Sequence, residues 1–210
     1  MTEVPRIIDI YQGDNVDSFQ TAYDAGLRAV IHKATTGATG RDARYAERRG
    51  PALAAGLLWG AYHWGTKANV AAQIENFLKR AQPDEHTLVA LDFEKTPGNQ
   101  MSIQQAHQFL QGIEQKLGRK AVVYCGGYLK DTLHHQKDAV LGAHRLWLAQ
   151  YGNHAVPQDS WESYWLWQYT DGKSGPDPKK CPGVPGNSKG ELDCDRYEGT
   201  LAQLRTEWAT

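Results

Sequence analysis

Short apolar runs recur along the whole chain, and polar or amphipathic stretches separate them. Several runs are almost continuous in apolar residues, as expected for strands that are buried on both faces. These runs predict eight strands, at residues 5–12, 27–34, 57–64, 87–94, 120–127, 145–152, 164–171 and 190–197.

The stretches between the early runs have the periodicity of amphipathic helices. An apolar stripe over residues 70–81 predicts one helix. Ser102 and Gln105 have the spacing of a capping box and predict the start of another. The pair Gly50-Pro51 is expected to break or restart a helix that begins near Asp42.

Alternating strands and helices predict an α/β fold built on a parallel sheet. The last three strands are joined by loops that are too poor in helical pattern to supply crossover helices. A closed, TIM-like β/α barrel with degenerate last units, (β/α)5(β)3-like, therefore fits better than an open sheet. The first strand also lacks the glycine fingerprint of a dinucleotide-binding fold, since IDIYQGDN contains one glycine.

Composition agrees with one domain over residues 1–210, because a chain of this length with 40% hydrophobic residues can bury a real core. The net charge of -1 argues against a nucleic-acid binder. The longest uncharged stretch, between Arg49 and Lys67, is too rich in glycine for a membrane span. The first residues lack the pattern of a secretory signal. We expect a monomer.

The three cysteines are too few for a disulfide scaffold. Cys125 lies in an apolar run and is expected to be a buried small hydrophobe. Cys181 and Cys194 flank a loop rich in Gly and Pro, and the sequence leaves open whether they form a disulfide. No close Cys pair lies beside His at zinc-ligand spacing, so we expect no metal and no cofactor.

Acidic residues occupy the ends of three predicted strands. In a β/α barrel the chemistry lies at the C-terminal ends of the strands. Asp9 ends the first run, Asp92 and Glu94 end the fourth, and Asp193 and Asp195 lie in the eighth. An unpaired charge inside an apolar run is costly. Acids at three strand ends therefore predict one shared site.

Asp92 and Glu94 are two residues apart, so their side chains lie on the same face of a strand with Cα atoms about 6.5–7 Å apart. Two carboxyl groups this close raise each other's pKa, which keeps one protonated near neutral pH. A general acid for a glycosidic oxygen needs that property. The pair predicts glycoside hydrolysis and leaves retention or inversion open, because side-chain rotamers span both separations.

Aromatic residues with a polar group are unusually frequent, with 7 Trp and 10 Tyr against 4 Phe. Such rings suit a surface that is partly wet, and flat rings can stack on sugar faces. The candidate substrate-binding residues at the other strand ends are Lys33, Tyr62, Trp64, Tyr124, Tyr151 and Gln168. Trp165 and Trp167 are expected to pack between the barrel and its helices.

The ordered segments IIDIYQG, KATTG, GAYHW, LDFE, VVYCG, LWLAQY, WQYTDG and LDCDRY resemble glycoside hydrolase family 25, the Chalaropsis-type lysozymes, through nearly the whole chain. The resemblance implies a barrel with degenerate last units. It also implies an N-acetylmuramidase that cleaves the β-1,4 bond between N-acetylmuramic acid and N-acetylglucosamine in peptidoglycan.

The resemblance also implies roles for the acids. Glu94 matches the general acid/base, Asp92 the group that orients the substrate's 2-acetamido group, and Asp9 and Asp193 the flanking acids that position substrate or water. The expected reaction is retaining, with assistance from the 2-acetamido group. Tyr62, Tyr124 and Gln168 match positions that line the sugar groove.

The last motif departs from the family pattern. Where the family commonly has Asp-x-Asn, this chain has Asp193-Cys194-Asp195. The sequence leaves the division of roles between Asp193 and Asp195 open, and Asp195 is counted among the substrate-binding candidates.

Two other functions remain to be weighed. A metal-dependent hydrolase would use Asp9, Asp92 and Asp193 with His32 or His63, but strand parity predicts that both histidines point away from Lys33 and Tyr62. A non-catalytic peptidoglycan-binding module would not need the Asp92/Glu94 pair. The substrate lies outside the cytoplasm, so we expect phage-type release at lysis, specialised secretion, or a trimmed mature form.

Overall fold

Eight strands close into a barrel in the computed structural model, which describes residues 6–210. All eight predicted strands are present. Residue 5, at the start of the first run, lies outside the described residues, and so do the first residues, for which no secretory signal was predicted. The strands are β1 Ile7–Ile10, β2 Ala29–Thr36, β3 Gly40–Arg41, β4 Leu58–Trp64, β5 Leu88–Asp92, β6 Val122–Cys125, β7 Leu146–Ala149, β8 Leu166–Thr170 and β9 Asp193–Arg196. The two-residue strand β3 is an addition to the edge of β2.

The barrel is mixed, which corrects the prediction of a parallel sheet. Parallel pairing runs from β1 through β2, β4, β5, β6 and β7 to β8, whereas β9 is antiparallel to both β8 and β1. A parallel connection needs a crossover, usually a helix, and the segment 171–192 contains none. The chain therefore returns in the opposite direction and closes the barrel.

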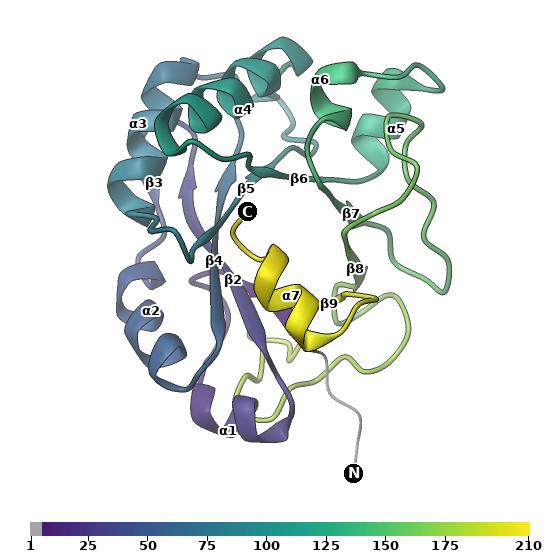
Figure 1. The fold of residues 1–210 in the computed structure, drawn as a ribbon. Helices are drawn as coiled ribbons and strands as arrows, with labels where there is room; N and C mark the ends of the chain where they lie inside the picture. Colours follow the sequence, from purple (N-terminus) through teal and green to yellow (C-terminus); the bar gives the residue numbers. More distant parts are fainter. Residues whose placement is uncertain (1–5) are drawn as a thin grey trace.

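Helices cover the outside of the first half of the barrel (Figure 1). The chain order gives α1 Phe19–Ala25, α2 Tyr45–Ala54, α3 Val70–Ala81, α4 Ile103–Leu117, α5 Gly127–Leu133, α6 Ala139–Gly142 and α7 Leu201–Glu207. The capping box at Ser102 and Gln105 is confirmed, with both reciprocal hydrogen bonds present.

The predicted break at Gly50-Pro51 is wrong, because α2 runs through Pro51. Proline removes the hydrogen bond to the carbonyl of the residue four positions earlier, here Glu47. Glu47, Gly50 and Pro51 are all exposed, so water can bind that carbonyl. One missing bond on the solvent side is tolerated when the opposite face of α2 is held by Tyr45 and Ala52 in the core.

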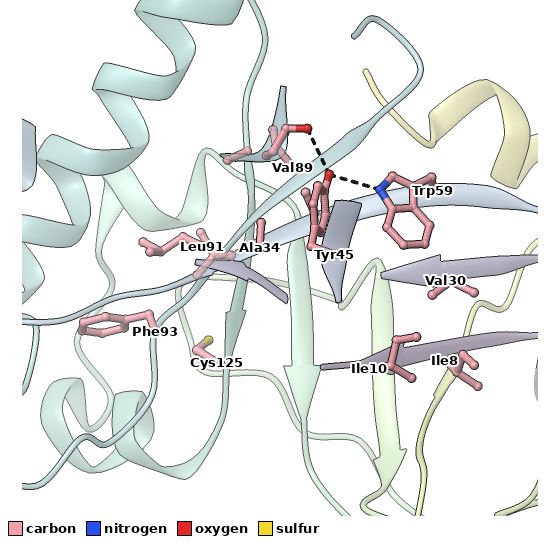
Figure 2. Close-up of a cluster of buried hydrophobic side chains, with 14 of the residues drawn as sticks. Ile8, Ile10, Val30, Ala34, Tyr45, Trp59, Val89, Leu91, Phe93 and Cys125 are labelled. Carbon is pink, nitrogen blue, oxygen red and sulfur yellow. Dashed lines mark hydrogen bonds between the residues drawn. The ribbon is translucent and has the colours of Figure 1, made fainter. Parts of the chain in front are cut away.

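Apolar side chains pack between the strands and the helices, and the polar groups among them are paired (Figure 2). Trp59 Nε1 of β4 donates to the Tyr45 hydroxyl of α2 at 3.1 Å, and that hydroxyl donates to the carbonyl of Ala81 at 3.1 Å. His32 lies beside both rings. Trp167 belongs to this outer layer, as its parity predicts.

The C-terminal helix α7 closes the end of the barrel where the parallel strands begin (Figure 1). Leu204 and Trp208 pack against residues inside the barrel such as Ile7 and Leu88. Trp208 Nε1 donates to the carbonyl of Trp59 at 2.8 Å. Arg145, just before β7, donates to the carbonyl of Thr210 at 2.7 Å. Among residues 6–210, α7 therefore covers this end of the barrel, and the cavity opens at the other end.

The structure leaves Cys125, Cys181 and Cys194 as buried free thiols. Burial raises the pKa of Cys125 to about 12, so it behaves as a small hydrophobe, as its sequence context predicts. The loop rich in Gly and Pro that precedes β9 packs on the segment after β1, where Asn15 and Gly186 form an isolated β-bridge.

Candidate active site

A cavity of about 200 Å³ opens at the carboxyl ends of the parallel strands. All four predicted catalytic acids and six of the seven predicted substrate-binding residues line it. Its lining residues are Asp9, Tyr11, Lys33, Tyr62, Trp64, Asp92, Glu94, Tyr124, Trp147, Tyr151, Gln168 and Asp193. The seventh, Asp195, is not in the cavity wall and lies beneath it, with 1% of its surface exposed.

Asp92 and Glu94 enter the cavity from the end of β5. Asp92 is 3% exposed, and its Oδ1 has no hydrogen-bond partner among the described residues. Gln100 holds the segment after the strand by donating to the Glu94 carbonyl at 3.0 Å and accepting from the Thr96 amide at 2.6 Å. Burial raises the pKa of Asp92 and of Glu94, and for Asp92 the neighbouring Glu94 raises it further.

Lys33 brings a positive charge to the same wall. A bulge in β2 after Lys33 shifts the register against β4, and Lys33 Nζ lies 4.0 Å from the centre of the Trp64 ring. At that distance the ammonium has a cation–π contact. Burial lowers the pKa of Lys33, while Asp92 and Glu94 oppose that change. Lys33 in turn lowers the pKa of both acids.

A chain of hydrogen bonds crosses the cavity to Asp9. Tyr124 of β6 donates its hydroxyl proton to Gln168 Oε1 at 2.9 Å, and Gln168 Nε2 of β8 donates to Asp9 Oδ2 at 2.7 Å. All three side chains are more than 90% buried. Burial is the main cause that raises the pKa of Asp9. The amide orientation of Gln168 is thereby set by a donor on one side and an acceptor on the other.

Asp193 reaches the site because β9 is antiparallel. It is the first residue of β9 and pairs with Asp9 of β1, so both lie at the same end of the barrel. In a parallel strand, the first residue would lie at the end that α7 closes. Burial, followed by the charge of Asp9, raises the pKa of Asp193 to about 9.

The raised pKa of Asp193 predicts a pH-dependent loss of stability. The folded protein holds the Asp193 proton from the ordinary value of 3.8 up to about 9, so stability falls as pH rises through that window. Asp193→Asn removes this ionisation. Near pH 8, we expect the unfolding midpoint of the variant to exceed that of the wild type by about 2–4 °C for each kcal/mol by which its free energy of unfolding is higher. Near pH 4, we expect a smaller difference.

Thermal unfolding followed by circular dichroism at both pH values checks this expectation. Asp131→Asn is the control, because Asp131 is exposed on α5. A difference between Asp193→Asn and the wild type that is equal at the two pH values would contradict the assignment.

Two residues of the cavity were missed from the sequence, Tyr11 and Trp147. Strand parity is the signal that could have found them, since Tyr11 is two residues after Asp9, and Trp147 shares the parity of Tyr151. Trp147 is 1% exposed, and its ring centre lies 4.6 Å from that of Tyr124 in a T-shaped contact.

The histidines considered for a metal site face away from the cavity, as parity predicts. His63 stacks on Phe109 with ring centres 4.7 Å apart, and Arg48 of α2 donates a hydrogen bond to His32 Nε2 at 3.2 Å. Burial lowers the pKa of His32 to about 3 and that of His63 to about 4. Within residues 6–210, no three His, Cys, Asp or Glu side chains are grouped to hold a metal ion.

The family model described as "Glycosyl hydrolases family 25" matches residues 8–177. The chain belongs to this family. The match runs from β1 through the cavity acids of β5 to the loop that follows β8. Membership makes the chain a glycoside hydrolase and confirms the resemblance of its strand-end motifs. No curated protein sequence matches the chain.

Solved structures of lysozymes and muramidases share the fold. The bacterial lysozyme of Streptomyces coelicolor has a TM-score of 0.84 at 22% identity, with 100% of this chain and 99% of that chain covered. The muramidase of Trichobolus zukalii has a TM-score of 0.79 at 26% identity, with 99% of each chain covered. A family 25 lysozyme of Aspergillus fumigatus has a TM-score of 0.77 at 26% identity, covering 97% and 98%.

Proposed function

We propose that the chain is an N-acetylmuramidase that hydrolyses the β-1,4 bond between N-acetylmuramic acid and N-acetylglucosamine in bacterial peptidoglycan. The observation that carries this proposal is the Asp92/Glu94 pair, which lies with two further acids in one cavity at the end of a family 25 barrel. The similar structures named above are lysozymes and a muramidase.

Glu94 is the residue suited to donate and recover the proton. Burial raises its pKa, so its protonated form persists to higher pH than that of an ordinary glutamate. It is also less buried than Asp92, so its carboxyl group is accessible from the cavity. Glu94 protonates the glycosidic oxygen as the bond to the anomeric carbon breaks.

Asp92 orients the substrate's 2-acetamido group, whose carbonyl oxygen is the nucleophile. The carbonyl oxygen of the 2-acetamido group attacks the anomeric carbon to give a cyclic oxazolinium ion, and Asp92 accepts a hydrogen bond from the amide N–H. Its buried Oδ1, which has no partner in the described chain, is available for that bond. Glu94 then removes a proton from the water that opens the ring, which restores the starting protonation state.

Aromatic rings and polar groups around these acids are suited to hold a glycan strand. Trp64, Tyr62, Tyr11 and Tyr151 line the cavity, and Tyr11 and Tyr151 are 40% and 44% exposed. Partly exposed rings offer flat faces to sugars while their hydroxyl groups remain wet. Asp9 and Asp193 would position the substrate or the water on the side opposite β5.

Digestion of purified peptidoglycan tests the proposal. Mass spectrometry of the soluble products should find N-acetylmuramic acid at the new reducing ends. Proton NMR of fresh product should show the β-anomer first, because attack by the acetamido group and then by water inverts the centre twice. Reducing ends made of N-acetylglucosamine would contradict the bond assignment, and an initial α-anomer would contradict the acetamido mechanism.

We also propose that the chain acts as a monomer on the bacterial cell wall. It would reach the wall by release at lysis, by specialised secretion, or as the mature form of a secreted precursor. No helix within residues 6–210 has both the length and the apolar character needed to cross a bilayer.

A further inference from the structure

Two buried carboxyl groups meet beneath the cavity, and the mechanism above uses only one of them. Asp9 is 6% exposed and Asp195 is 1% exposed. In the antiparallel pair of β1 and β9, Asp9 lies opposite Asp193, and Ile7 lies opposite Asp195. Asp195 therefore lies one diagonal step below Asp9 on the same inner face. The two carboxyl groups are near enough for the charge of Asp195 to raise the pKa of Asp9.

A hydrogen bond between the two carboxyl groups would require a proton, because an ionised carboxylate has no donor. The N–H donors around the pair do not replace it. Gln168 Nε2 donates to Asp9 Oδ2 at 2.7 Å, and Trp147 Nε1 donates to Asp195 Oδ1 at 2.6 Å. Asp195 Oδ2 is buried and has no donor elsewhere in the described chain. Two charges side by side in such a site, with an unmet acceptor, would be strongly unfavourable.

The charges that surround the pair are mostly of the same sign. Lys33 of β2 is a half-buried cation in the cavity wall, and it interacts with Asp92 and Glu94. Trp147 of β7 and Gln168 of β8 do not titrate. The remaining titratable groups that line the cavity or act on the pair are Tyr11 and Asp14 after β1, Tyr62 on β4, Asp92 and Glu94 at β5, Tyr124 on β6, Tyr151 after β7, Asp171 after β8 and Asp193 on β9.

We propose that Asp9 and Asp195 hold one proton between them, and that Asp195 is a positioning residue that fixes Asp9 through this proton. The O–H of one carboxyl group donates to an oxygen of the other, so the pair carries one negative charge. No covalent step is involved. Trp147 fixes Asp195 by donating to its Oδ1. Asp195 in turn fixes Asp9 in the position where Asp9 accepts from Gln168, which itself accepts from Tyr124.

The shared proton links the site to pH. Loss of the proton would place two charges in contact and push Asp9 away from Asp195 and from its bond with Gln168. Burial raises the pKa of both carboxyl groups, so this loss occurs on the alkaline side. The activity part of this inference rests on the proposed muramidase function, whereas the shared proton does not.

Asp195→Asn is the decisive variant. Trp147 Nε1 can only donate, so the Asn carbonyl must face Trp147, and its NH2 group must face Asp9. Asp9 then receives a permanent donor and becomes ionised without a shared proton. The infrared difference spectrum of the wild type minus the variant near pH 7 should show the carbonyl band of one protonated carboxylic acid, because other protonated carboxyl groups, such as Asp193, are present in both proteins.

The activity on purified peptidoglycan should change in a matching way. The ratio of the variant's activity to that of the wild type should rise several-fold from neutral to alkaline pH, because only the wild type loses the shared proton. A residue with a merely structural role would give a ratio that does not depend on pH. An unchanged infrared band together with a constant ratio would overturn the proposal.

Asp9→Asn removes the same proton from the other side and should lose the same band, so it decides the question if Asp195→Asn does not fold. Asp131→Asn, on the exposed face of α5, should change neither the band nor the pH profile. If the wild type fails to hydrolyse peptidoglycan, the proposed function fails, and the infrared result still decides whether the proton is shared.

Discussion

Glu94→Gln should lower the rate of peptidoglycan hydrolysis by about a thousandfold, since general acid–base catalysis contributes roughly 10²–10⁴. Glutamine has nearly the same shape as glutamate, but it can neither protonate the glycosidic oxygen nor accept a proton from water. Glu94 enters the cavity beside Asp92 and Lys33. The rest of its surroundings, including the Gln100 contacts to the backbone, do not involve its side chain.

The measurement is release of reducing ends from purified peptidoglycan at several pH values, with circular dichroism to confirm the fold. Glu85→Gln is a matched control, because Glu85 is exposed and precedes β5 at the opposite end of the strand. The control should retain wild-type activity. A Glu94→Gln variant with activity within tenfold of the wild type would exclude Glu94 as the acid.

Trp208→Ala should destabilise the protein by about 3–5 kcal/mol, the range for removing a large buried aromatic side chain. Trp208 is 2% exposed and packs beside Trp165 at the closed end of the barrel. The substitution leaves a cavity and also removes the donor to the Trp59 carbonyl. The expected fall in the unfolding midpoint is about 2–4 °C for each kcal/mol in a domain of this size.

Denaturant unfolding measures this effect directly. Trp208→Phe keeps most of the ring and loses the N–H donor, so it should destabilise the protein less than Trp208→Ala does. Thr206→Ala, on the exposed side of α7, should change stability by less than about 0.5 kcal/mol. A loss below about 1 kcal/mol for Trp208→Ala would mean that α7 contributes little to closing the barrel.

The two ends of the barrel affect stability in opposite directions. At the closed end, Leu204 and Trp208 bury apolar surface and stabilise the fold. At the open end, burial raises the pKa values of Asp9, Asp92, Glu94 and Asp193, which lowers stability as pH rises. Such destabilising groups persist at functional sites because the chemistry needs them.

Local pattern was sufficient for most elements. Each of the eight apolar runs became a strand, because a segment buried on both faces must be apolar wherever it lies in the barrel. The capping box at Ser102 and Gln105 marked the start of α4, because its hydrogen bonds form within four residues. The break predicted at Gly50-Pro51 failed because packing of the inner face of α2 outweighs one lost bond.

The candidate site was found for a related reason. Asp92 and Glu94 share one face of β5 through local parity, and the barrel brings the carboxyl ends of its parallel strands to one rim. Tyr11 and Trp147 obey the same parity and were missed because no acid marked them. Asp195 shares the parity of Asp193, yet it lies one step deeper, which parity does not report.

The sequence by itself determined the strands, most helices, the family and the acids of the cavity, because these depend on periodicity and on short-range spacing. Only the tertiary structure decided the direction of β9, the closure of the barrel by α7, and the placement of Asp195 diagonally from Asp9 on the inner face. These features join residues far apart in the chain. The stability of each feature depends on which strand edges and apolar surfaces the rest of the barrel leaves uncovered. Local sequence patterns do not contain that information.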